Sequence, residues 1–250
     1  MMNQRNIATG QRGMVASAHP TISSSGIQML RMGGNAMDAA IAMALTSDVI
    51  FPDMCGLGGD AFFLYYDVSL NKVFAIEGSG HSGEHYDIEF FKQLNKETID
   101  EHGPHSISVP GAVAAYFLGL RQFGSKTFKE CANDAIFLSE QGCSVSSKLA
   151  NYIQKHRQRV ALDSDLSSIL FDQQGQPKKF GDIMVQTSLA QTLKLLSEGD
   201  ETTFYTELAS TMVKSLNDKG NKLTERDFEF MEASIKEPIS LQYQNNTIFQ

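Results

Sequence analysis

Side chains of the types that bind metal ions gather in one short segment of the sequence. Glu77, His81, Glu84, His85 and Asp87 supply carboxylate and imidazole groups, which are common ligands of zinc and other divalent metals. A His-x-x-x-His pair serves one metal only in a helical segment, and the glycines beside His81 make a helix there unfavourable. We therefore favour a solvent-exposed acidic loop and predict no metal site.

The same segment carries a glycine pattern known from dinucleotide-binding folds. Residues 78–83 read Gly-Ser-Gly-His-Ser-Gly, and Asp100 stands near the spacing expected of a ribose partner. That fingerprint needs a helix that starts inside it and then a buried parallel strand, whereas residues 95–105 read as a polar loop. The context disfavours a bound nucleotide, and we predict no cofactor.

Two further candidates involve serine chemistry and a glycine turn. The sequence has no Gly-x-Ser-x-Gly nucleophile elbow, and Ser17 and His19 are too close in sequence to establish a triad, so we interpret them as structural. The turn from Gly56 to Asp60 leaves two alternatives open. It is either a tight connection between a helix and a strand or the wall of a pocket, because glycine permits close backbone approach.

The elements that position these residues are a helix and a hairpin. Asn35 is suited to cap a helix whose alanines and methionines recur at helical spacing until Phe51-Pro52 stops it. Its small side chains predict burial against a sheet. Residues 61–66 follow as a strand so apolar that we expect cover on both faces, and a turn over 67–72 leads to a partner strand over 73–76.

The rest of the chain reads as mostly helical. We expect a flexible arm over 1–12 and an exposed loop over 161–181. Short strands are predicted over 13–18 and 107–109, with a strand-like alternation over 238–249 that we expect to continue beyond Gln250. Helices are predicted over 22–32, 86–94, 110–123, 127–142, 146–159, 187–197 and 204–217, with a short one after Thr224.

Composition limits the class of protein. The 250 residues, 42% of them hydrophobic, can bury a sizeable core, and we interpret residues 1–250 as a single domain. A net charge of −8 with scattered basic residues argues against a nucleic-acid partner. The three cysteines lack Cys-x-x-Cys spacing, which indicates free thiols in a reducing compartment. Without a signal-peptide pattern or a membrane-spanning run, we expect a cytoplasmic protein with no membrane contact.

Five motifs, in order along the chain from about Gln11 onward, together resemble the γ-glutamyltranspeptidase family. They lie at 13–17, 33–40, 56–62, 78–80 and 109–113, and read Gly-Met-Val-Ala-Ser, Gly-Gly-Asn-Ala-x-Asp-Ala-Ala, Gly-Leu-Gly-Gly-Asp-x-Phe, Gly-Ser-Gly and Val-Pro-Gly-Ala-Val. The resemblance implies an α+β fold of the N-terminal nucleophile hydrolase type, an αββα sandwich that is incomplete in this chain.

The resemblance also implies a two-part enzyme. Family members are made as one precursor that cuts itself, and the threonine exposed at the start of the small subunit attacks the γ-glutamyl bond, with its own α-amino group as base. This chain resembles the large-subunit portion and ends before the cleavage site, so we assign no catalytic residue within it. The implied partners are a small-subunit half carrying that threonine and a small-molecule γ-glutamyl substrate.

Ser79 and His81 are the substrate-binding residues that the resemblance implies. Classic members place an arginine at the position of Ser79 to hold the glutamyl α-carboxylate, and a sister branch places it at the position of His81. The absence of both guanidinium groups argues against glutathione as the preferred donor. Two hypotheses stay open: the large-subunit part of a γ-glutamyl hydrolase or transferase, or a truncated, inactive member acting as a binding or structural protein.

Overall fold

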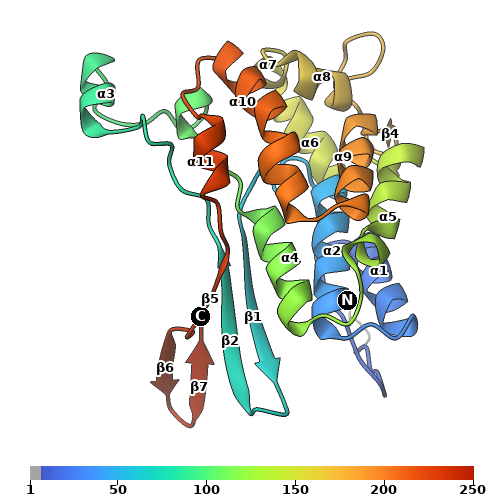
Figure 1. Cartoon of the computed structure of the whole chain (residues 1–250). Coiled ribbons are helices and arrows are strands. Elements are labelled where there is room, and N and C mark those ends of the chain that lie inside the picture. The colour runs from blue at the N-terminus through green and yellow to red at the C-terminus, as the bar shows by residue number, and fades with distance from the viewer. Residues whose placement is uncertain (1–6) are drawn as a thin grey trace.

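Helices dominate the chain in the computed structural model, which describes residues 7–250, and they pack on one face of a small sheet (Figure 1). The helices are α1 Pro20–Arg31, α2 Ala36–Ile50, α3 Ile88–Gln93, α4 Ala112–Phe123, α5 Phe128–Gln141, α6 Ser147–Lys155, α7 Arg157–Val160, α8 Ser164–Leu170, α9 Thr187–Glu198, α10 Ala209–Asp218 and α11 Glu225–Glu229, with a 3-10 turn at Pro104–Ser106 and a π-helical turn at Thr203–Glu207. The strands are β1 Ala61–Asp67, β2 Lys72–Gly78, β3 Cys143–Ser144, β4 Ile183–Met184, β5 Ser234–Lys236, β6 Ser240–Tyr243 and β7 Asn246–Phe249.

The main sheet has the strand order β1-β2-β5, with antiparallel neighbours. The predicted hairpin is confirmed, with Phe63 opposite Ile76 and Tyr65 opposite Phe74. These side chains share one face of the sheet, and α4 packs against β1 and β2 on that face. The fold is therefore α+β, as expected.

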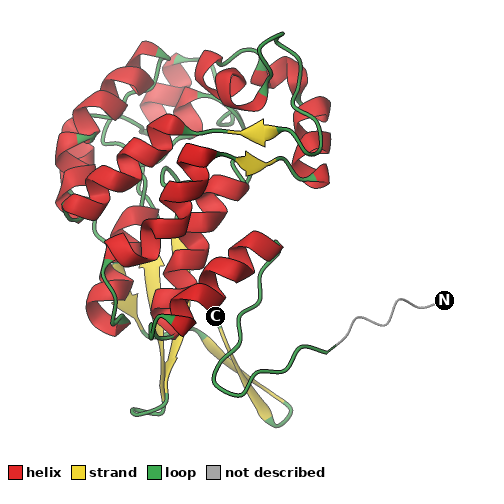
Figure 2. Ribbon diagram, turned by 90° about the vertical axis from the view of Figure 1, so that its right-hand side faces the viewer, coloured by secondary structure: helices red, strands yellow, loops and turns green. Residues whose placement is uncertain are grey.

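The prediction that both faces of β1 are covered is wrong for the residues that the structure describes. Phe62, Leu64 and Tyr66 point away from α4 and are 64%, 50% and 53% exposed. An apolar run on both sides of a strand is typical of a strand between two layers. Only one of those layers lies within residues 7–250, and the hairpin extends beyond the helices (Figure 2).

Helix α2 is buried as predicted, but its surroundings differ from the prediction. It packs against α1, α5 and α4, and α4 separates it from most of the sheet (Figure 1). Gly119 of α4 makes this contact close, because a Cβ there would lie 3.1 Å from Met37 Sδ and 3.2 Å from Ile41 Cδ1. Small side chains permit close approach of helices as well as of a helix and a sheet, and the sequence pattern does not distinguish the two.

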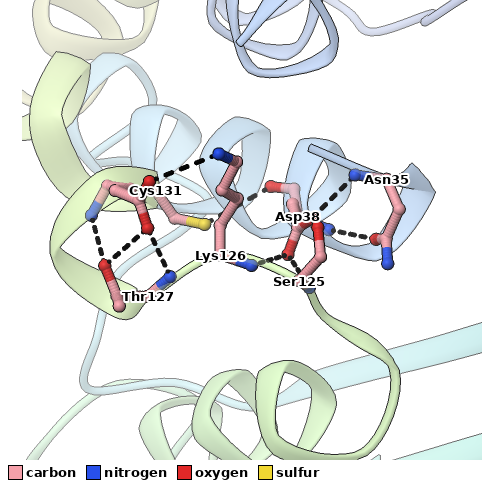
Figure 3. Close-up of polar contacts among 7 residues, drawn as sticks. Asn35, Asp38, Ser125, Lys126, Thr127 and Cys131 are labelled. Atoms are coloured by element: carbon pink, nitrogen blue, oxygen red, sulfur yellow. Dashed lines mark hydrogen bonds and ion pairs between the residues drawn. The ribbon is translucent and has the colours of Figure 1, made fainter. Parts of the chain in front are cut away.

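The start of α2 anchors the loop between α4 and α5 (Figure 3). Asn35 Oδ1 accepts hydrogen bonds from the amides of Met37 and Asp38, which confirms the predicted cap. The buried Asp38 carboxylate accepts from the Asn35 amide at 2.7 Å and from the amide and hydroxyl of Ser125 at 2.9 and 2.6 Å. It also accepts from the Lys126 amide at 3.1 Å. One buried charge thus joins α2 to the start of α5.

Several predicted elements differ in form. Residues 13–18 and 107–109 form no strand, and residues 238–249 form the β6–β7 hairpin, turning at Gln244, instead of one strand. The helix predicted over 146–159 divides at His156. The segment 161–181 contains α8, because the Asp163 carboxylate caps it by accepting from the Asp165 and Leu166 amides. Of the predicted arm 1–12, residues 1–6 lie outside the described residues.

Candidate functional site

The glycine turn after β2 is held against the segment that precedes α4. The Gly80 amide donates to Asp60 Oδ1 at 2.8 Å, and the Val109 amide donates to the His81 carbonyl at 2.9 Å. A Cβ on Gly80 would lie 1.8 Å from the Val109 carbonyl oxygen, so only glycine fits. No helix begins within residues 78–83, since α3 starts at Ile88. The context that a dinucleotide fingerprint requires is therefore missing from this turn.

Ser79 belongs to a small polar network at the end of β2, the middle strand of the sheet. Its hydroxyl donates to Glu77 Oε1 at 2.7 Å, and Glu77 Oε2 pairs with the ammonium group of Lys236 on β5. The hydrogen bond from Lys236, followed by that from Ser79, lowers the pKa of Glu77 below its ordinary value. The positive charge in this network, the ammonium group of Lys236, is thus already paired with the Glu77 carboxylate.

His81 lies beside the N-terminus of α11. Its Nδ1 donates to the Ser82 carbonyl at 3.0 Å, and its Nε2 is buried with no hydrogen-bond partner among residues 7–250. Burial raises the pKa of Asp227, but hydrogen bonds from the Glu84 amide and from Thr224, together with the charge of His81, lower it overall. The Asp227 carboxylate thus interacts with His81 through its charge, without a direct ion pair among the described residues. The structure does not bring His81 and Ser79 into one hydrogen-bond network.

The other polar residues of this segment serve separate local contacts. The Asp87 carboxylate caps α3 by accepting from the Phe90 amide at 2.7 Å, and Glu84 lies 3.8 Å from His85. Across the described part of the chain, no three His, Cys, Asp or Glu side chains are grouped closely enough to hold a metal ion. The sequence-adjacent ligand types are thus not brought together.

Ser17 and His19 act in the local structure at the start of α1. His19 Nδ1 accepts a hydrogen bond from the Thr21 amide at 3.2 Å and so caps the helix, while the Ser17 hydroxyl donates to the His19 carbonyl at 2.8 Å. The hydrogen bond from the Thr21 amide thus uses Nδ1 of the imidazole to cap the helix. The structural interpretation of this pair is confirmed.

The turn from Gly56 to Asp60 both connects two elements and forms the wall of a cavity. The Gly59 carbonyl accepts from the amides of Gly111 and Ala112 and thereby fixes the start of α4. Beneath the turn lies a cavity of about 540 Å³. Its lining comprises Ala44, Ser47, Asp48, Pro52, Asp53, Met54, Cys55, Gly56, Gly58, Gly59, Asp60 and Tyr116.

Asp48 and Tyr116 form a buried polar pair in this cavity. Asp48 is 4% exposed, and the Tyr116 hydroxyl donates to its Oδ2 at 3.2 Å. Burial raises the pKa of Asp48 to about 7, although the Tyr116 hydrogen bond acts in the opposite direction. Burial, followed by the charge of Asp48, raises the pKa of Tyr116. Sequence reasoning missed this pair, for which an aspartate within the apolar run of α2 was the available signal.

Helix length and hydropathy bear on the membrane prediction. Across residues 7–250, none of the helices is both long enough and apolar enough to cross a bilayer.

Comparison with known proteins agrees with the motifs. The sequence pattern of the family described as Gamma-glutamyltranspeptidase matches residues 23–250. The glutathione hydrolase proenzyme of Bacillus subtilis (strain 168) is 31% identical over 98% of this chain and 42% of its own length. The acylase ACY 1 proenzyme of Pseudomonas sp. (strain V22) is 30% identical over 98% of this chain and 45% of its own length. The chain thus spans less than half the length of these curated relatives.

Solved structures show that the similarity extends to the fold of this chain. The γ-glutamyltranspeptidase of Helicobacter pylori superposes with a TM-score of 0.92 at 26% identity, covering 98% of this chain and 71% of the other. A cephalosporin acylase from Bacillus halodurans gives a TM-score of 0.87 at 27% identity, covering 100% of this chain and 49% of the other. Motifs, sequence match and fold agree, and the chain belongs to the γ-glutamyltranspeptidase family.

Proposed function

We propose that this chain is the large-subunit part of an enzyme that hydrolyses or transfers γ-glutamyl groups, with the catalytic threonine in a small-subunit half outside residues 1–250. The relatives named as proenzymes extend over more than twice the matched length, which leaves room for such a half. The exposed apolar face of the sheet is the observation that carries this proposal.

That face has the composition of a buried layer. Phe62, Leu64 and Tyr66 stand on β1 opposite Glu77, Ala75 and Val73 of β2, so the face is apolar except at one end, where Glu77 pairs with Lys236. Contiguous exposed apolar surface of this kind marks an interaction site. In an αββα sandwich a second sheet would cover it, and we assign that sheet to the small-subunit half.

We expect the donor to be a γ-glutamyl amide other than glutathione. Neither Ser79 nor His81 offers a permanent positive charge, Lys236 is paired with Glu77, and the charge of Asp227 acts on His81. A free α-carboxylate would therefore meet hydroxyl and imidazole groups beside carboxylates. Acylases among the relatives are consistent with a family site that accepts varied acyl groups.

The free cysteines support our proposal that the protein works in the cytoplasm.

The purified chain alone should not cleave a γ-glutamyl anilide, and co-expression with its small-subunit segment should restore activity and co-purification. Leu64→Asp should abolish co-purification, because a charge would enter the contact between the two sheets. Val68→Asp is the matched control, since Val68 is 77% exposed in the hairpin turn. If both variants still co-purified with the small-subunit segment, this assignment of the sheet face would be contradicted.

The intact mass of the natural protein, read with the coding sequence beyond Gln250, separates the two hypotheses. A continuing chain, or a neighbouring reading frame, with a threonine at a new N-terminus supports the enzyme. A natural protein of 27.5 kDa with no such partner would support instead the truncated, inactive member that binds ligands or other proteins.

Replacing Ser79 by arginine should restore selection for donors with a free α-carboxylate in the assembled enzyme. A guanidinium offers two donors and a permanent charge, and a hydrogen bond to a charged group contributes about 1.5–3 kcal/mol. His81→Arg is the matched comparison, and we expect a smaller gain there because Asp227 would pair with the new charge. The measurement is the ratio of kcat/KM for a γ-glutamyl amide and its decarboxylated analogue. If neither substitution changed this ratio relative to the unaltered enzyme, the donor would bind elsewhere.

A further inference from the structure

The cavity beneath the Gly56–Asp60 turn has an unusual balance of charge. Asp48, Asp53 and Asp60 line it, and its lining contains no Lys, Arg or His side chain. Ordinarily a buried carboxylate is paired with a cation or fully hydrogen-bonded, because removing its charge from water is costly. Asp60 is exposed and accepts from the Gly80 amide, whereas the buried Asp48 is neither paired with a cation nor fully hydrogen-bonded by the described residues.

Two carboxylate groups in the cavity have unused hydrogen-bonding capacity. Tyr116 is the one described residue that hydrogen-bonds to Asp48, through Oδ2, although the side chain is more than nine-tenths buried. Asp53 Oδ1 is buried and has no hydrogen-bond partner among the described residues. Asp48 and Asp53 line the same cavity, and after burial their charges are the next causes that raise the pKa of the Cys55 thiol.

We propose that this cavity binds a primary ammonium group carried on a small apolar body. Its N–H donors would satisfy the unused oxygens of Asp48 and Asp53, and its alkyl portion would contact Ala44, Pro52 and Met54. A divalent metal fits less well, because no three carboxylate or thiol groups among the described residues that line the cavity are grouped closely enough to hold a metal ion. The proposal concerns this chain alone and does not depend on the missing half.

Titration of the isotope-labelled chain with butylammonium, followed by NMR in phosphate buffer at pH 8, tests this site. The amides of Gly56, Gly58 and Gly59 line the cavity and should shift on binding. For so small a ligand we expect a Kd of about 1 mM. Butan-1-ol has the same shape without the charge and should bind at least about tenfold more weakly, because charge-assisted hydrogen bonds are the stronger class.

Variants locate the contact. Asp48→Asn and Asp53→Asn should each weaken butylammonium binding by about tenfold or more and leave the alcohol unaffected. Asp134→Asn is the matched control, because burial raises the pKa of that carboxyl too but it lies on α5, outside the cavity. The amine should also bind more weakly at pH 6, where Asp48 is largely protonated. The other titratable groups of the lining are Asp53, Asp60, Cys55 and Tyr116, and the Lys148 ammonium group contacts the lining residue Met54.

The comparison of amine and alcohol on the unaltered chain decides the proposal even if a variant fails to fold. Equal affinity for both molecules would overturn it, as would the absence of any shift at the three glycine amides. Equal loss in Asp134→Asn and Asp48→Asn would overturn the assignment to this cavity.

Discussion

Asp48→Asn should stabilise the chain at pH 8 by up to about 4 kcal/mol. Burial raises the pKa of Asp48 from 3.8 in the unfolded chain to about 7 in the fold, and each tenfold change in an ionisation constant corresponds to about 1.36 kcal/mol. Above pH 7 the folded chain must keep a buried carboxylate ionised without a countercharge. Asparagine removes that charge and can still accept the hydrogen bond from Tyr116.

The sign follows from proton binding. Between about pH 4 and 7 the folded state holds a proton on Asp48 that the unfolded state has released, so the contribution of this group to stability falls as the pH rises. Below pH 4 both states are protonated and the penalty disappears. The advantage of Asp48→Asn should therefore be small at pH 4, grow through pH 7 and stay constant above it.

Urea unfolding of both proteins across this pH range measures the difference, and groups that titrate alike in both cancel. The buffer should contain no amine such as Tris, because a bound ammonium would stabilise the ionised carboxylate. Asp67→Asn provides a control of opposite sign, since hydrogen bonds from the Ser69 hydroxyl and then the Leu70 amide lower the pKa of Asp67. A pH-independent difference between Asp48→Asn and the unaltered chain would contradict the assigned pKa.

The elements that could be predicted from sequence are those that local signals define. Asn35 and Thr127 both start helices through capping boxes, which can be recognised within four residues. The β1–β2 hairpin follows from the apolar runs on either side of a polar turn. Such features depend on neighbours in the chain, so a single sequence contains them.

The parts of the site that could not be predicted from the sequence depend on contacts between distant segments. Asp38 reads as a helix residue, yet its carboxylate also holds Ser125 and Lys126, far along the chain. Asp48 and Tyr116 meet only because α4 packs on α2 beneath the Gly56–Asp60 turn. Ser79 and His81 are two residues apart, yet they face different partners, Glu77 and Asp227. No periodicity or spacing in the sequence indicates such contacts between side chains.

Phe63→Asp should abolish folding of the chain, whereas Leu64→Asp, one residue away, should leave it folded. Phe63 faces α4 and packs edge-to-face on Tyr116, with ring centroids 6.1 Å apart, opposite the fully buried Ile76. Phe63 is partly buried, and aspartate would remove the ring and place an unpaired charge against the core. We expect a loss of about 4 kcal/mol or more, which approaches the whole stability of a domain at the low end of the usual range of about 5–15 kcal/mol.

Leu64 tests the other face under the same chemistry. It is 50% exposed, so Leu64→Asp should change the free energy of unfolding by no more than about 1 kcal/mol. Soluble yield and urea midpoints of the two variants measure this contrast, and Phe63→Leu separates loss of the ring from addition of a charge. If Leu64→Asp were as damaging as Phe63→Asp, the apolar face of β1 would already be covered in the isolated chain, by a second copy of itself. A concentration-dependent midpoint for the unaltered protein would then be expected as well, because self-association links stability to protein concentration.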